Sequence, residues 1–247
     1  MLKFSPGKHN AKLKKLEKKL GLKVYTFSLM SGHTCPYAKD CHSKAIETPE
    51  GWRIEDGPHT QFRCFSASQD VLFTALRKQR QHNMQVVELA SKPLGVVAAA
   101  ALIESSIPLD AEVIRIHVGG DFKTQAYFDA WLNTAKAYSH ILFYAYTKSL
   151  PFWVKRLNDI PKNFHLTASY GGHRDDLIAK YNLRYAKVVY TQAEAKRLGL
   201  DIDHDDSHAA GSGPSFALLI HGAQPKGSEA NKALQRIKRR ARRKVVA

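Results

Sequence analysis

The chain has 247 residues, which suits one large domain, and 44% of them are hydrophobic, which is enough for a sizeable core. Its longest apolar run, LGVVAAAALI at 94–103, is too short to cross a bilayer, and the N-terminus lacks the apolar stretch of a signal peptide. These features argue against a membrane partner and favour the cytoplasm, where three cysteines indicate thiols or metal ligands rather than disulfides.

The net charge of +16 is concentrated at the two ends of the chain. Residues 1–23 hold eight lysines and one glutamate, and residues 232–244 hold eight basic residues and no acid. We therefore divide the chain into a basic N-terminal arm or helix at 1–23, a single domain at 24–231 and a basic C-terminal tail at 232–247. Cationic segments of this density favour nucleic acid, although solvated segments that only maintain solubility are the alternative.

The N-terminal segment NAKLKKLEKKL, residues 10–20, predicts a short basic amphipathic helix. Asn10 is a suitable N-cap and Gly21 a suitable C-terminal stop. Three apolar residues have the spacing of one helical face: Leu13, Leu16 and Leu20.

All three cysteines follow the first predicted strand, KVYTFSL at 23–29. They are Cys35, Cys41 and Cys64, and they lie in a segment at 31–66 that we predict to be a long loop. Loops of this length without structure of their own are uncommon, and most are functional or held by a ligand.

The rest of the chain alternates between helices and strands. Residues 67–105 predict helix with a break near 92–95, because proline interrupts the pattern there. Five apolar strands separated by helical segments follow, at 112–120, 140–149, 163–172, 185–191 and 215–222. With the first strand they predict an α/β fold in which about six parallel strands form a partial or closed (β/α) barrel; an open doubly wound sheet is the alternative.

Polar and small residues stand at the carboxyl ends of these strands, where parallel α/β folds collect their chemistry. Turns need such residues in any case, so part of the pattern is structural. Asp121 and Lys148 are our candidate catalytic residues. The candidate cofactor-binding residues are Gly119, Gly120, Asp121, Thr147, Ser169 and Arg174.

Three thiolates in one segment can hold an iron–sulfur cluster and leave one iron free for another ligand. Zinc is an alternative, with His33, His42 or His59 as the fourth ligand. Three unligated thiols, acting as small apolar side chains, are a further alternative.

The cysteine segment after the first strand and the Gly-Gly-acid turn after the second resemble the layout of radical S-adenosylmethionine enzymes. The resemblance implies that Cys35, Cys41 and Cys64 bind a 4Fe–4S cluster and that S-adenosylmethionine binds its free iron. It also implies that the turn at 119–121 holds the amino group of that cofactor. The spacing here is C-x5-C-x22-C and the acid is aspartate, whereas that superfamily uses C-x3-C-x2-C and glutamate.

A second resemblance covers nearly the whole chain. The motifs GHTCPYAKDC, DGPHTQFRCFSASQD, RIHVGGDF, FYAYTKSLPFW, LTASYGG, IDHDDSHA and SFALLIHGAQPKGSEA are similar to those of the phage and plasmid family called gene product 88. The resemblance implies a mobile-element protein acting in the cytoplasm of a host cell, and it brings no established activity.

The segment IDHDDSHAAGSG, residues 202–213, is rich in carboxylates and imidazoles. Such side chains suit a divalent metal, but they are equally typical of a solvated loop. The four residues in question are His204, Asp205, Asp206 and His208.

These observations favour an iron–sulfur protein, in its strongest form a divergent radical S-adenosylmethionine enzyme acting on a nucleic acid or nucleotide. The alternative is a non-catalytic nucleic-acid-binding protein with a structural zinc or iron–sulfur site. A protein that blocks a host factor through its surface is a third possibility. The sequence contains no GxSxG, P-loop, HExxH or EF-hand motif, so hydrolase and NTPase functions have no support.

Overall fold

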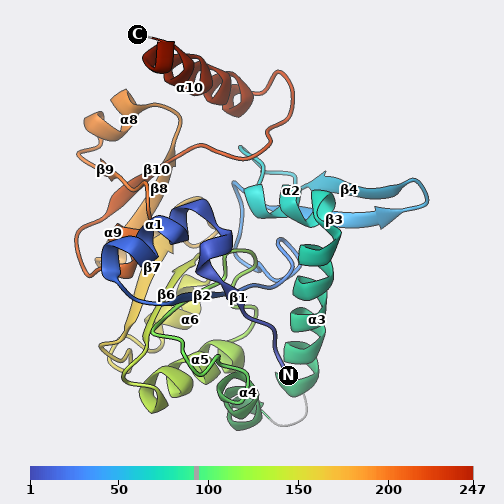
Figure 1. The fold of residues 1–247 in the computed structure, drawn as a ribbon, viewed down its shortest axis with the longest axis vertical. Helices are drawn as coiled ribbons and strands as arrows, with labels where there is room; N and C mark the ends of the chain where they lie inside the picture. The colour runs from blue at the N-terminus through green and yellow to red at the C-terminus, as the bar shows by residue number, and fades with distance from the viewer. Residues whose placement is uncertain (92–94, 247) are drawn as a thin grey trace.

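The computed structural model describes residues 1–91 and 95–246 and shows a mixed α/β fold built on one large sheet (Figure 1). The strands are β1 (Ser5–Pro6), β2 (Val24–Phe27), β3 (Ser43–Thr48), β4 (Gly51–Asp56), β5 (Val113–Ile116), β6 (Leu142–Thr147), β7 (Phe164–Ser169), β8 (Tyr185–Val189), β9 (Asp201–Ile202) and β10 (Phe216–Leu219). The helices are η1 (Gly7–His9), α1 (Ala11–Leu20), α2 (Phe65–Leu72), α3 (Thr74–Ser91), α4 (Gly95–Glu104), α5 (Gln125–Ala137), α6 (Leu150–Val154), α7 (Asp176–Lys180), α8 (Gln192–Arg197), α9 (Ser207–Ala210) and α10 (Glu229–Val246).

The six strands predicted from the sequence are all present, as β2, β5, β6, β7, β8 and β10. They lie side by side in chain order and pair in parallel. The prediction of a closed barrel is wrong, because β1 pairs antiparallel with β2 at one edge and β9 pairs with β10 at the other. A doubly wound sheet is also absent from the described residues, since the six predicted strands follow chain order across the sheet without a reversal.

Helices cover both faces of the sheet. On one face, α4, α5 and α7 pack on a core that includes Ile114, Ile116 and the fully buried Trp131. On the other face, α1 and α9 pack over alternate residues such as Val113 and Tyr144. All four residues of β5 are buried, Arg115 among them, which explains why apolar residues occur on both faces of this strand.

The basic N-terminal segment is built into the domain. Leu13 and Leu16 of α1 are fully buried against the sheet, whereas Leu20 is 39% exposed. The predicted ends of this helix are confirmed: the Asn10 side chain accepts a hydrogen bond from the Lys12 amide, and Gly21 ends the helix with a φ of 67°. The lysines of α1 therefore stand on a fixed surface.

The cysteine segment at 31–66 is not a structureless loop, which corrects that prediction. It contains an antiparallel hairpin, β3–β4, which projects from the body beside α2 (Figure 1). Only Pro49 and Glu50 separate the two strands, and Gly51 follows with a φ of 115°. The hairpin is missed by sequence reasoning because much of β4 faces solvent and only Trp52 and Ile54 form its short apolar alternation.

The predicted helical stretch at 67–105 is confirmed as α2, α3 and α4, while most of the expected break near 92–95 lies outside the described residues. The basic C-terminal segment forms α10, which lies beyond the end of the sheet (Figure 1). Its Ala230 and Ala233 are buried against Ile220. Among the described helices, none combines the length and the apolar character needed to cross a membrane.

Candidate functional site

The three cysteines belong to two segments that meet at the carboxyl ends of β2 and β5. Cys35 and Cys41 lie in a series of turns after β2, where the Gly32 amide donates to the Cys35 sulfur at 3.3 Å. Cys64 is the residue immediately before α2. All three thiols are partly buried and free of disulfides.

The thiols influence one another electrostatically. Burial raises the pKa of each, and that of Cys64 reaches about 11. After burial, the neighbouring Asp121 carboxylate and the Cys64 thiol raise the pKa of Cys35 further, and Cys41 does the same to Cys64. The Cys64 amide donates to the Ser43 hydroxyl at 3.4 Å, and the Ser43 amide donates to the Cys41 carbonyl at 2.8 Å, so the two cysteine segments lie side by side.

Asp121 stands beside this region and is 5% exposed. Its Oδ1 accepts hydrogen bonds from the Phe122 amide at 2.7 Å and from the Thr147 hydroxyl at 2.6 Å, and its Oδ2 accepts from the Lys148 amide at 2.8 Å. Burial raises its pKa to about 6, and the three hydrogen bonds oppose that rise. The carboxylate thus joins the end of β5 to the end of β6.

Lys148 is 6% exposed and lies near Cys41, whose pKa its charge lowers. Its ammonium donates to the Ser169 carbonyl at 2.9 Å, to the Ser169 hydroxyl at 2.7 Å and to the Tyr170 carbonyl at 2.6 Å. All three protons of the ammonium therefore have acceptors on the end of β7. Lys148 carries a positive charge into the site while it fixes the strand ends.

The two glycines of the predicted turn are places of close approach. A Cβ on Gly119 would lie 2.1 Å from the Ser66 hydroxyl, and a Cβ on Gly120 would lie 2.7 Å from the Thr34 hydroxyl. Gly120 also has a φ of 87°, which favours glycine. The turn at 119–121 consequently packs directly on the cysteine segments.

The remaining predicted cofactor residue, Arg174, lies outside this group. It is exposed and pairs with Asp176 at 3.0 Å. The amides of Gly171 and Gly172 donate to the Asp175 carboxylate at 2.8 and 2.9 Å, so a side chain of the chain itself takes the place where an anion would bind. Of the predicted site residues, the structure brings together Cys35, Cys41, Cys64, Gly119, Gly120, Asp121, Thr147, Lys148 and Ser169.

Sequence reasoning missed a buried ion pair behind Cys64. Arg80 of α3 pairs with Asp70 of α2 at 2.6 Å and donates to the Ser66 hydroxyl at 2.7 Å. Burial raises the pKa of Asp70, while the Arg80 charge and the Ser31 amide oppose this. The signal in the sequence was that charged and polar residues stand among apolar ones in α2 and α3. No local pattern, however, indicates that these residues lie near the cysteines.

The acidic segment at 202–213 lies on the sheet face covered by α1 and α9. Asp206, with a φ of 62°, pairs with Arg115 and accepts a hydrogen bond from the Tyr144 hydroxyl at 3.3 Å. Asp205 lies 3.5 Å from the Lys19 ammonium, and His208 lies 3.9 Å from Asp203. Its side chains are thus divided among different partners.

Two of the three histidines considered as a fourth zinc ligand are hydrogen-bonded to main-chain carbonyls. The cysteines supply three sulfurs, whereas the His33 ring is hydrogen-bonded to the Ala45 carbonyl at 2.8 Å and the His42 ring to the Gly32 carbonyl at 3.4 Å. Within residues 1–91 and 95–246, no group of three or more cysteine, histidine, aspartate or glutamate side chains is arranged so that it could hold a metal ion. Ligation would require the thiols to lose protons, which a bound cation favours strongly.

Comparisons with known proteins give one match. A family model described as Gene product 88 matches residues 2–245, which is almost the whole chain. Searches of curated proteins and of solved structures found no significant match.

Proposed function

The chain belongs to the gene product 88 family of phage proteins, and from that premise we propose that it is an iron–sulfur protein whose cluster is held by Cys35, Cys41 and Cys64. One observation supports this above all: three free thiols from two segments lie at the carboxyl ends of parallel strands, where the charge of Cys41 raises the pKa of both Cys35 and Cys64. Three cysteine ligands are a donor set for a 4Fe–4S cluster with one iron left for another ligand.

We further propose that S-adenosylmethionine binds the free iron, as in radical S-adenosylmethionine enzymes. Six parallel strands in chain order, unclosed at the edges, support the likeness to a partial barrel. When bound, the cluster would supply one electron and a coordination site. Asp121 Oδ2 accepts a single hydrogen bond, so it retains the capacity to accept another from a ligand ammonium.

The residues around the thiols have defined tasks in this proposal. Lys148 and the hydrogen bonds of Asp121 fix the ends of β5, β6 and β7 beside the cysteine segments. Gly119 admits the Ser66 hydroxyl at a distance that no Cβ would tolerate. Together they hold the strand ends at a constant separation, which a ligand bound across them requires.

The proposed substrate is a nucleic acid or nucleotide. The basic helix α10 packs through Ala230 and Ala233 on Ile220 and Phe62, and Phe62 lies two residues before Cys64. A polyanion bound by the basic residues of α10 would therefore lie close to the cysteine segments. The exposed lysines of α1, which is fixed on the sheet, provide a second cationic surface.

The first experiment is metal and sulfide analysis of protein purified without oxygen. We expect iron and acid-labile sulfide, a brown colour and an absorbance shoulder at about 400 nm. Cys35→Ala, Cys41→Ala and Cys64→Ala should each reduce the iron content and the colour. Ser68→Ala is the matched control, because Ser68 is a buried residue of α2 whose hydroxyl has no hydrogen-bond partner among the described residues. A colourless protein that carries zinc, or full iron content in all three cysteine variants, contradicts the proposal.

The second candidate function is nucleic-acid binding without catalysis, with the metal serving only to hold the cysteine segments. The basic surfaces of α1 and α10 favour it. Deleting residues 1–23 would remove the buried Leu13 and Leu16, so charge reversal is the cleaner test. Lys14→Glu combined with Lys238→Glu should weaken binding and flatten its salt dependence. Iron-loaded protein that binds nucleic acid but neither binds nor cleaves S-adenosylmethionine favours this second function.

A further inference from the structure

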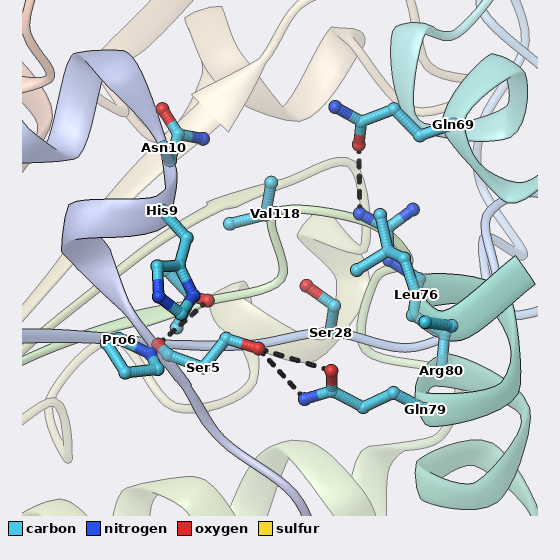
Figure 2. Close-up of a pocket in the computed structure, with 12 residues that line it drawn as sticks. Ser5, Pro6, His9, Asn10, Ser28, Gln69, Leu76, Gln79, Arg80 and Val118 are labelled. Carbon is cyan, nitrogen blue, oxygen red and sulfur yellow. Dashed lines mark hydrogen bonds between the residues drawn. The ribbon is translucent and has the colours of Figure 1, made fainter. Parts of the chain in front are cut away.

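A cleft of about 290 Å³ lies between the N-terminal residues 5–10 and the helices α2 and α3 (Figure 2). Its floor is formed by Thr26 and Ser28 from the β2 segment and by Val118, which follows β5. Its volume is near the lower end of the range for small-molecule sites. None of the functions argued above uses it.

Three carboxamide side chains from three elements line the cleft: Asn10, Gln69 and Gln79. Asn10 and Gln69 face each other from opposite sides in Figure 2. The Asn10 oxygen caps α1, and the Gln69 oxygen accepts from Arg80 at 3.0 Å. The NH₂ groups of these two side chains have no hydrogen-bond partner among the described residues, so they are able to donate to a ligand.

The lining combines apolar surface with polar groups and is electrically balanced. Arg80 reaches the cleft, but its charge is matched by the buried Asp70, and no aspartate or glutamate is among the lining residues. The Nε of Arg80 is buried and has no hydrogen-bond partner in the described part of the chain. The apolar parts of the wall are Pro6, Ala75, Leu76 and Val118. A neutral heterocycle with hydrogen-bonding edges fits this lining, and carboxamides are the side chains that pair with adenine edges in nucleic-acid complexes.

A second, more open hollow adjoins the cleft. The two share Ala75 and Gln79, and the second hollow is also lined by Lys3 and Lys78. Both lysines are exposed, and neither forms an ion pair with another described residue. A neutral cleft with a cationic hollow beside it matches a base joined to a phosphate.

We propose that the cleft binds the base of a nucleotide and that Lys3 and Lys78 contact its phosphate. The inference rests on the proposed function in taking a nucleotide as substrate, but it does not depend on the cluster. Arg80 connects the two sites, because it lines the cleft and donates to Ser66, two residues after Cys64. The nucleotide thus occupies a position beside the cysteine segments.

The test is isothermal titration of the full-length protein with adenosine 5′-monophosphate, adenosine, inorganic phosphate and a single-stranded deoxyadenosine oligonucleotide of about eight residues. We expect saturable binding of the nucleotide, weaker binding of adenosine and none of phosphate. Tighter binding of the oligonucleotide than of the monophosphate identifies a single strand as the source of the nucleotide, and the reverse order identifies a free nucleotide.

Two variants connect binding to the cleft. Ala75→Phe places a ring in the space shared by the two hollows and should weaken nucleotide binding by about 10-fold or more, since a filled pocket excludes its ligand. Ala75→Ser is the matched control, because Ala75 is exposed and the smaller side chain leaves the cleft open. Lys78→Glu should weaken the binding of the monophosphate but not that of adenosine. It should also lower the slope of the logarithm of monophosphate affinity against the logarithm of salt concentration by about 1. Lys136→Glu, an exposed change on α5, should leave both unchanged.

The same titrations are repeated on Cys64→Ser protein. Nucleotide binding that persists in the Cys64→Ser protein supports the proposed binding role of the cleft, whether or not the wild-type protein contains iron. Absence of saturable binding by any nucleotide, or binding that Ala75→Phe leaves intact, overturns the inference. Iron content, measured on the same samples, decides the cluster separately.

Discussion

Gln224 holds the backbone of Arg63 from both sides. Its Oε1 accepts from the Arg63 amide at 2.8 Å, and its Nε2 donates to the Arg63 carbonyl at 3.0 Å. Gln224 is 8% exposed and lies between β10 and α10, whereas Arg63 directly precedes Cys64. The position of Cys64 therefore depends on the C-terminal part of the chain.

Replacing Gln224 tests this dependence. Gln224→Ala removes these two hydrogen bonds and a third to the His221 carbonyl at 3.0 Å, and leaves partly buried main-chain groups without these partners, which should cost about 1–3 kcal/mol of unfolding free energy. Cys64 should also react faster with a thiol reagent in the folded, metal-free protein. Gln235→Ala, which removes only an exposed hydrogen bond to Asn231, is the control. Equal thiol reactivity in the two variants would show that residues 61–64 are held by other contacts.

Gly119→Ala should destabilise the protein, because its Cβ would lie 2.1 Å from the Ser66 hydroxyl and 3.1 Å from the Arg80 guanidinium carbon. Overpacking of this kind costs about 1–3 kcal/mol. Urea denaturation measures the loss. Gly213→Ala is the matched control, since a Cβ there meets no atom within 4 Å. In a Ser66→Ala background the cost of Gly119→Ala should fall; an unchanged cost would place the strain elsewhere.

The buried Asp121 should make stability depend on pH. Its folded pKa of about 6 lies above its ordinary value of 3.8, so the folded protein binds this proton more tightly than the unfolded chain does. Its contribution to stability is therefore greatest below pH 3.8 and is lost as the pH rises to 6, by about 2–3 kcal/mol in total. Asp121→Asn does not titrate, so the stability difference between wild type and variant should change across this window in denaturation curves. A constant difference would contradict the elevated pKa.

Breaking the Arg115–Asp206 pair should be costly. Arg115→Met leaves the Asp206 carboxylate, 1% exposed, with the Tyr144 hydroxyl and the Lys12 ammonium at 3.8 Å as its remaining side-chain partners among the described residues. Removing one partner of a buried pair costs about 3–5 kcal/mol. Arg174→Met breaks the exposed pair with Asp176 and should cost no more than about 1 kcal/mol. Similar losses in both variants would contradict a structural role for Asp206.

Local pattern was enough to identify much of this fold. The strand at 112–120 was predictable because all four residues of β5 are buried, and α1 because Asn10 and Gly21 mark its ends. The hairpin β3–β4 was missed because it is buried on one face only, whereas the strands predicted from the sequence are apolar on both faces. The sheet edges were misjudged since a two-residue strand such as β1 leaves almost no sequence signal.

By itself the sequence determined the strand and helix positions, the family and the residues that stand at the strand ends, because these follow from short-range periodicity and motif. Only the tertiary structure decided which of those ends meet. Ser66 and Arg80 reach Gly119 because two helices and a strand end pack at one point, while Arg174 turns to Asp176 in solvent. Contacts between residues distant in the chain depend on how the helices pack on the sheet. Local sequence patterns do not specify that packing.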